Sequence, residues 1–195
     1  MTYLSIRAAQ CVVVILFLTL SCAAVMGAKD PTLNAKVEQI KKITGDMAAG
    51  HQAMITHMNR AQQSAGIKNS RKEGDKARQG GKDLVATGKK ALSILEEILR
   101  SPTASRDLRK LAEEATCHLR ASIHNAHEGM IHTHHIHMVG GLRGGVGHVK
   151  DGVNHARVSA RMRVNAEEYF DKMIVENGDP DHEPYTVMPE KFCGF

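Results

Sequence analysis

The chain has 195 residues, 24% of them charged, and a formal net charge of +5 with the histidines neutral. It has three Tyr, four Phe and no Trp, which argues against a β-sandwich or barrel, because those folds place aromatic residues along many strands. The mixed charge argues against full disorder, and seventeen Gly without a regular period exclude a collagen-like chain.

The first 27 residues predict a cleaved signal peptide for export. Arg7 provides the positive charge at its start, and an apolar run follows at 11–20. Ten residues are too few to span a bilayer as a helix, which needs about 20. Cleavage is expected after Gly27, with cleavage after Ala24 as the second choice. A lipoprotein signal at Cys22 is a weaker alternative. We therefore expect a periplasmic or secreted protein with no stable membrane insertion after cleavage.

The segment 28–175 has the apolar spacing of four helices. Apolar residues recur in alternating steps of four and three over 33–65, which is typical of a helix in a bundle. The same rhythm runs through 77–98, 108–130 and 149–174. Four helices joined by short connections predict an all-α fold, an antiparallel four-helix bundle.

Residues that start or stop helices mark the boundaries. Pro31 is favourable in a first helical turn, and the third helix is expected to begin near Thr103 or Ser105. The Gly-rich segment 140–147 predicts a flexible connection before the fourth helix. Residues 176–195 contain three Pro and predict a non-helical tail.

Two cysteines, Cys117 and Cys193, remain once the signal peptide is removed. Exported proteins with two cysteines usually pair them. A disulfide here would join the tail to the third helix and stabilise the fold by about 3–5 kcal/mol. The alternative is that the two thiolates bind a soft metal ion.

Histidine is concentrated in the third predicted helix, where seven of the twelve lie between residues 118 and 137. His148 and His155, seven residues apart, share a face of the fourth helix, and His51 and His57 lie on the first. This density predicts a metal site rather than isolated core or surface histidines. Four of the seven share a sector roughly 100° wide and are called the histidine ladder: His124, His127, His134 and His135.

Methionine lies three residues after several of these histidines. Positions i and i+3 are neighbours on a helix face, so a His-x-x-Met unit can offer an ion one imidazole nitrogen and one thioether sulfur. That donor pair favours Cu(I), whereas imidazole alone suits Cu(II), zinc or nickel. We therefore predict bound copper, with zinc, nickel and silver as alternatives; for Met54 and its seam neighbours alone, core packing is preferred. The units add these candidates: His51 with Met54 and His57, His127 with Met130, and His135 and His137 with Met138.

The segment 147–156, together with the histidine ladder and the export signal, resembles the small metal-binding protein family, SmbP. The resemblance implies an exported four-helix bundle that binds copper and other divalent ions. The His-x-x-Met units are also similar to those of the periplasmic copper- and silver-binding proteins PcoE and SilE.

The spacing of other motifs does not support catalysis or nucleic-acid binding. His127 and His132 flank a sequence similar to the zinc-protease H-E-x-x-H motif, but they are five residues apart and point roughly 140° away from each other. The basic residues at 68–78 have no aromatic neighbours for stacking on bases, so a solvated face is preferred.

The leading hypothesis is a non-enzymatic exported protein that buffers or sequesters copper or similar ions. The alternative is a structural or interaction bundle of the cell envelope with a pH-responsive His-rich face. A third hypothesis, an enzyme with one metal centre, requires a tight site with an open coordination position. Homo-oligomer formation is left open.

Overall fold

The structure is a computed structural model that describes residues 30–64, 66–138 and 142–178, including all side chains there except those of 137, 138 and 142–146. No strand occurs in these residues. The predicted signal peptide at 1–27 lies outside them, as does the tail after residue 178. The four helices are α2 (Pro31–Gln63), α3 (Ile67–Arg100), α4 (Arg106–Met138) and α5 (Leu142–Gly178).

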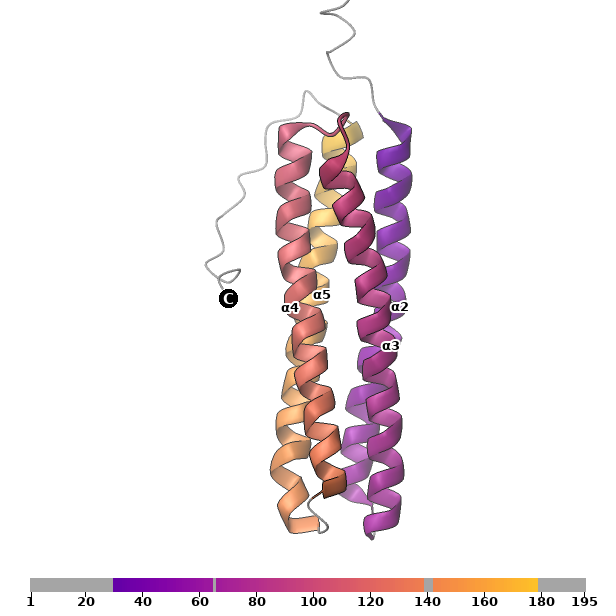
Figure 1. The fold of residues 1–195 in the computed structure, drawn as a ribbon, viewed down its shortest axis with the longest axis vertical. Coiled ribbons are helices and arrows are strands. Elements are labelled where there is room, and N and C mark those ends of the chain that lie inside the picture. The colour runs from indigo at the N-terminus through magenta and orange to yellow at the C-terminus, as the bar shows by residue number, and fades with distance from the viewer. Residues whose placement is uncertain (1–29, 65, 139–141, 179–195) are drawn as a thin grey trace, which may run out of the picture. The chain divides into compact units, whose positions relative to one another are not determined.

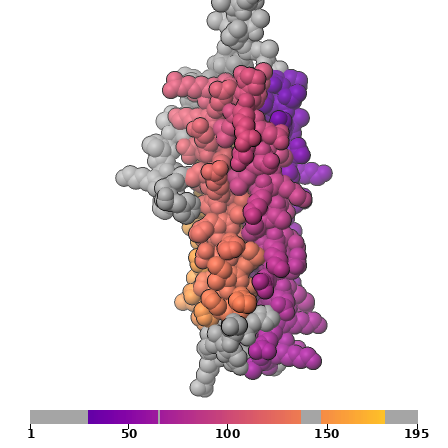
Figure 2. All heavy atoms as spheres, in the orientation of Figure 1, coloured from indigo at the N-terminus to yellow at the C-terminus, as the bar shows by residue number. Residues whose placement is uncertain are grey.

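The four helices alternate in direction and form one antiparallel bundle (Figure 1). Each helix packs beside its neighbours in the chain, and α5 packs against α2 to close the ring. In the space-filling view, α3 and α4 pack side by side along the face shown (Figure 2). The predicted all-α bundle is therefore confirmed.

Local sequence explains where α2 and α4 begin. Pro31 is the first residue of α2, as predicted. Ser105 directly precedes α4, and its Oγ accepts a hydrogen bond from the backbone N–H of Leu108 at 3.0 Å. This is the bond of an N-cap residue, and Asp107 adds a negative charge to the first turn, where the helix dipole favours it.

The fourth helix begins earlier than its sequence predicts. The segment 140–147 was expected to be a flexible connection, but α5 starts at Leu142, so most of that segment is helical. A Gly costs about 1 kcal/mol in a helix relative to Ala. Because α5 packs against α4 and α2, packing outweighs that cost, as it does in most protein helices. The basic residues at 68–78 also belong to a helix, α3.

The apolar seam predicted for the first helix faces the core. Most buried apolar residues belong to one main cluster, which includes Phe170 and Leu119. A second core cluster lies at the end where α4 is followed by α5: Met58, Ala77, Ile136, Val149 and Val153. The buried residues of α2 match the predicted seam: Leu33, Val37, Ile40, Thr44, Met47, His51, Met54, Met58 and Ala61.

Glycines let the helices approach closely and leave room for methionine side chains. A Cβ on Gly80 would lie 3.3 Å from the carbonyl oxygen of Gly50, so α2 and α3 are near contact there. A Cβ on Gly81 would overlap the side chain of Met130 and lie 3.1 Å from Sδ of Met54. These two methionines therefore fill space that the missing side chain leaves in the core.

Replacing Gly88 with Ala is expected to lower the free energy of unfolding by about 1–3 kcal/mol, because the new Cβ would lie 2.7 Å from Cγ1 of the β-branched Ile123. Gly45→Ala is the matched control, since nothing lies within 4 Å of its Cβ position. The control should stabilise the protein by up to about 1 kcal/mol through helix propensity. Urea unfolding of both variants measures the difference, and equal stabilities would contradict the packing described.

None of the helices in the described part of the chain combines the length and apolar character needed to cross a membrane.

Candidate metal centre

Three histidines from two facing helices converge near the end of the bundle. His132 and His135 extend from α4 and His148 from α5, and each is half-buried. One ligand nitrogen from each lies within 4.8 Å of the other two. Among the described residues, no other group of three His, Cys, Asp or Glu side chains meets that distance. We call these three residues the histidine triad.

The distances in the histidine triad suit a single transition-metal ion. Nδ1 of His132 and Nδ1 of His148 are 3.4 Å apart. Nitrogens about 2.0–2.1 Å from a tetrahedral ion lie about 3.3 Å from one another, so this pair already has the spacing of two ligands. The ring centroids of His135 and His148 are 4.8 Å apart, which brings the third imidazole to the same point.

The electrostatics around His132 favour its neutral imidazole, the form that binds metal. Burial lowers the pKa of His132, and the positive charges of His155, His148 and His135 lower it further, while Asp151 opposes the shift. Nδ1 of His135 is buried and accepts or donates no hydrogen bond within the described residues. In the tautomer that leaves this nitrogen unprotonated, its lone pair is available to an ion.

The register of the α4–α5 pair brings these residues together. His132 of α4 lies opposite His148 of α5. Seven residues earlier in α4 and seven residues later in α5, Asn125 lies opposite His155. The triad flanks the second core cluster, since Ile136 follows His135 and Val149 follows His148. The histidines therefore occupy the edge of the core, where the apolar seam passes into the solvent-exposed face.

Most of the histidine ladder lies outside the triad. His124, His127 and His134 are exposed on α4, and only His135 joins the triad. The side chains of His137 and Met138 lie outside the described part of the structure.

His132 was not among the predicted ligands. It lies about 60° around the helix from His135, outside the narrow sector that defined the ladder. Two features of the sequence could have identified His132. It lies three residues before His135, so the two share a helix face, and the next helix carries a histidine that can lie opposite them.

His155, a predicted ligand, lies beside the triad. Its ring is stacked on that of His132, with centroids 5.3 Å apart and planes 19° from parallel. Its Nδ1 is 3.1 Å from Oδ1 of Asn125. It is therefore near the triad but outside the 4.8 Å group.

The predicted ligands on α2 have other partners. His51 is 3% exposed, and its Nε2 is 2.7 Å from Oγ of Ser159, which donates to the carbonyl oxygen of Ser122. Burial, together with the positive charge of Arg163, lowers the pKa of His51 to about 4, so it is a neutral core residue. His57 forms a 2.7 Å contact with the carboxylate of Glu73 instead.

Two methionines of the predicted His-x-x-Met units, Met54 and Met130, pack in the core. Met54 is fully buried, and Met130 packs against Gly81 while His127, three residues before it, is exposed. Helical spacing alone therefore does not place the imidazole of His127 and the thioether of Met130 at one site.

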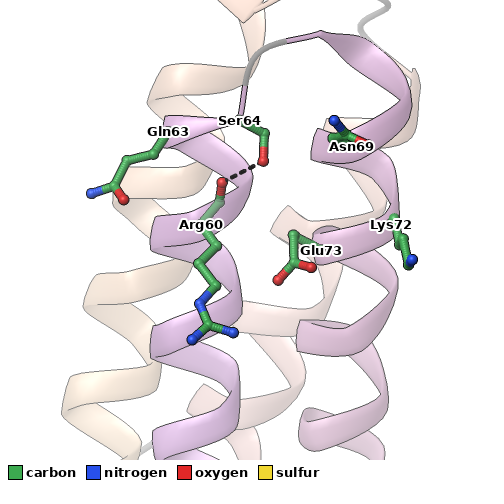
Figure 3. A pocket seen from close by; sticks show the side chains of 6 residues that line it. All are labelled: Arg60, Gln63, Ser64, Asn69, Lys72 and Glu73. Atoms are coloured by element: carbon green, nitrogen blue, oxygen red, sulfur yellow. Dashed lines mark hydrogen bonds between the residues drawn. The ribbon is translucent and has the colours of Figure 1, made fainter.

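A polar cleft of about 370 Å³ lies where α2 is followed by α3 (Figure 3). Oγ of Ser64 donates to the carbonyl oxygen of Arg60 at its rim. Lys76 and His57 hold the carboxylate of Glu73 and lower its pKa to about 2. The lining residues are Arg60, Gln63, Ser64, Asn69, Lys72 and Glu73, and none belongs to the triad.

Cys117 lies on α4, whereas Cys193 lies outside the described residues, so the disulfide stays a prediction.

Fold and site together define a histidine-rich, all-α four-helix bundle. No protein-family model, curated protein or solved structure matches the chain.

Proposed function

We propose that this protein binds a transition-metal ion at the histidine triad and buffers or sequesters it without catalysis. The convergence of His132, His135 and His148 is the observation that carries the proposal. Three half-buried imidazoles without an ion repel one another when protonated, and Nδ1 of His135 has no hydrogen-bond partner within the described residues. A bound ion removes both costs.

We propose that the bound ion is copper and that the protein is exported. The donors are imidazole nitrogens, which suit Cu(II), zinc and nickel better than silver, and copper(II) binds such sites most tightly of the divalent first-row ions. The predicted signal peptide supports a place outside the cytoplasm, where a small soluble bundle can hold ions.

Copper(II) or zinc is expected to raise the melting temperature of the purified, metal-stripped protein. An ion at a hundred times its dissociation constant stabilises a fold by about 2.7 kcal/mol, which corresponds to about 5–10 °C for a chain of this size. Calorimetry with each ion, and magnesium as the control, measures the shift. A protein that neither binds nor is stabilised by either ion would refute the proposal and favour an envelope bundle with a pH-responsive His-rich face.

A further inference from the structure

A fourth imidazole, that of His155, is stacked on one ring of the histidine triad. The ring centroids of the triad are 4.8, 5.6 and 6.3 Å apart. The centroid of His155 is 5.3 Å from that of His132. His155 is therefore as close to a triad member as the triad members are to one another.

Asn125 determines which nitrogen of His155 is available. Its Nδ2 donates to the carbonyl oxygen of Ala121 at 2.9 Å, which turns Oδ1 toward α5. That oxygen, 3.1 Å from Nδ1 of His155, can only accept, so Nδ1 carries the proton. A neutral imidazole has one N–H, and Nε2 of His155 is therefore left with a lone pair for an ion.

We propose that His155 is a fourth ligand of the ion held by the triad, and that Asn125 positions it. The inference rests on the proposed function. His155 lies outside the 4.8 Å group, so its ring turns toward the ion on binding while Nδ1 still donates to Asn125. Four protein ligands complete the coordination shell, as in structural sites, whereas catalytic sites keep a position for water. The arrangement therefore fits storage of an ion and disfavours a metalloenzyme.

Spectroscopy of the full chain loaded with one ion tests the ligand number. Electron paramagnetic resonance with Cu(II), and X-ray absorption with Zn(II), should show four nitrogen ligands in the wild type. His155→Ala should show three nitrogens and one oxygen from water, with affinity lowered by about 10-fold or more. Three nitrogens in the wild type, or a His155→Ala variant that binds as the wild type does, would overturn the proposal.

The positioning role needs variants of Asn125. Asn125→Ala should lower affinity by about 10-fold, and Asn125→Asp should restore part of it, because a carboxylate accepts from Nδ1 of His155 although it cannot donate to the carbonyl oxygen of Ala121. Asn154→Ala, an exposed change on α5, is the matched control. Circular dichroism checks that each variant is folded. Failure of the Asp variant to restore binding, or equal binding by Asn125→Ala and the control, would overturn the positioning role. A wild type that binds neither ion refutes the proposed function itself.

Discussion

His135→Ala is expected to lower the affinity for copper(II) and zinc by at least about 100-fold. Loss of an outer hydrogen-bond partner of a metal ligand alone costs about 10- to 100-fold, so loss of the ligand itself should reach the upper end of that range. His135 is a favourable position for the test, because its buried Nδ1 has no hydrogen bond within the described residues that the substitution would break. The metal-free fold should therefore persist.

His127→Ala is the matched control for that variant. It makes the same chemical change on the same helix at an exposed position, and it should leave tight binding unchanged. Competition with a chromophoric chelator measures both affinities. A double variant, His127→Ala with His134→Ala, separates binding by the histidine ladder from binding by the triad. The variant should lose bound ions if the ladder binds them, and should keep the tightly bound ion if the triad binds it. Equal binding by His135→Ala and the wild type would refute the triad.

The stability of the metal-free protein is expected to fall by about 3 kcal/mol between pH 6.5 and pH 4 because of His51. Its pKa is lowered from 6.5 to about 4 in the folded protein by burial and, next, by the positive charge of Arg163. In the unfolded chain the imidazole takes up a proton below pH 6.5, whereas the folded protein resists protonation until about pH 4. Protons therefore favour the unfolded state across that interval, at about 1.4 kcal/mol for each pKa unit.

His51→Gln isolates this contribution. The amide does not titrate and can still form a hydrogen bond with Oγ of Ser159, the group that faces His51 from α5. Urea unfolding at several pH values, with a chelator present, should show a steeper loss of stability toward acid in the wild type than in the variant. Parallel curves for the two proteins would show that His51 does not titrate as its burial requires.

The helices were predictable from the sequence because each carries its own signal. The buried face of α2 repeats the predicted spacing residue by residue from Leu33 to Ala61, and Pro31 and Ser105 act locally on the backbone at the start of a helix. The early start of α5 at Leu142 was not predictable in this way. Gly has a poor helix propensity, and the packing that overrides it comes from another helix.

The proposed metal site was only partly predictable because its candidate ligands belong to two helices. Angular position on a single helix selected His124 and His127, which are exposed, and omitted His132, which faces α5. The relevant neighbour of His132 is His148, and only the register of the α4–α5 pair brings them together. His135, His148 and His155 were predicted as candidate ligands, but the sequence does not predict that they lie close together in the fold.

Apolar burial is unequal along the bundle, and this inequality affects how fast an ion bound at the triad would dissociate. The triad lies beside the second core cluster, which contains few large side chains, whereas Phe170 and most of the leucines belong to the main cluster. Segments that bury less apolar surface open locally at a lower free energy than the whole domain. If the triad holds an ion as we propose, its release is governed by this local opening while the rest of the protein stays folded. Ion exchange and global unfolding would then be separate events with different barriers, so the protein could release such an ion without losing its fold.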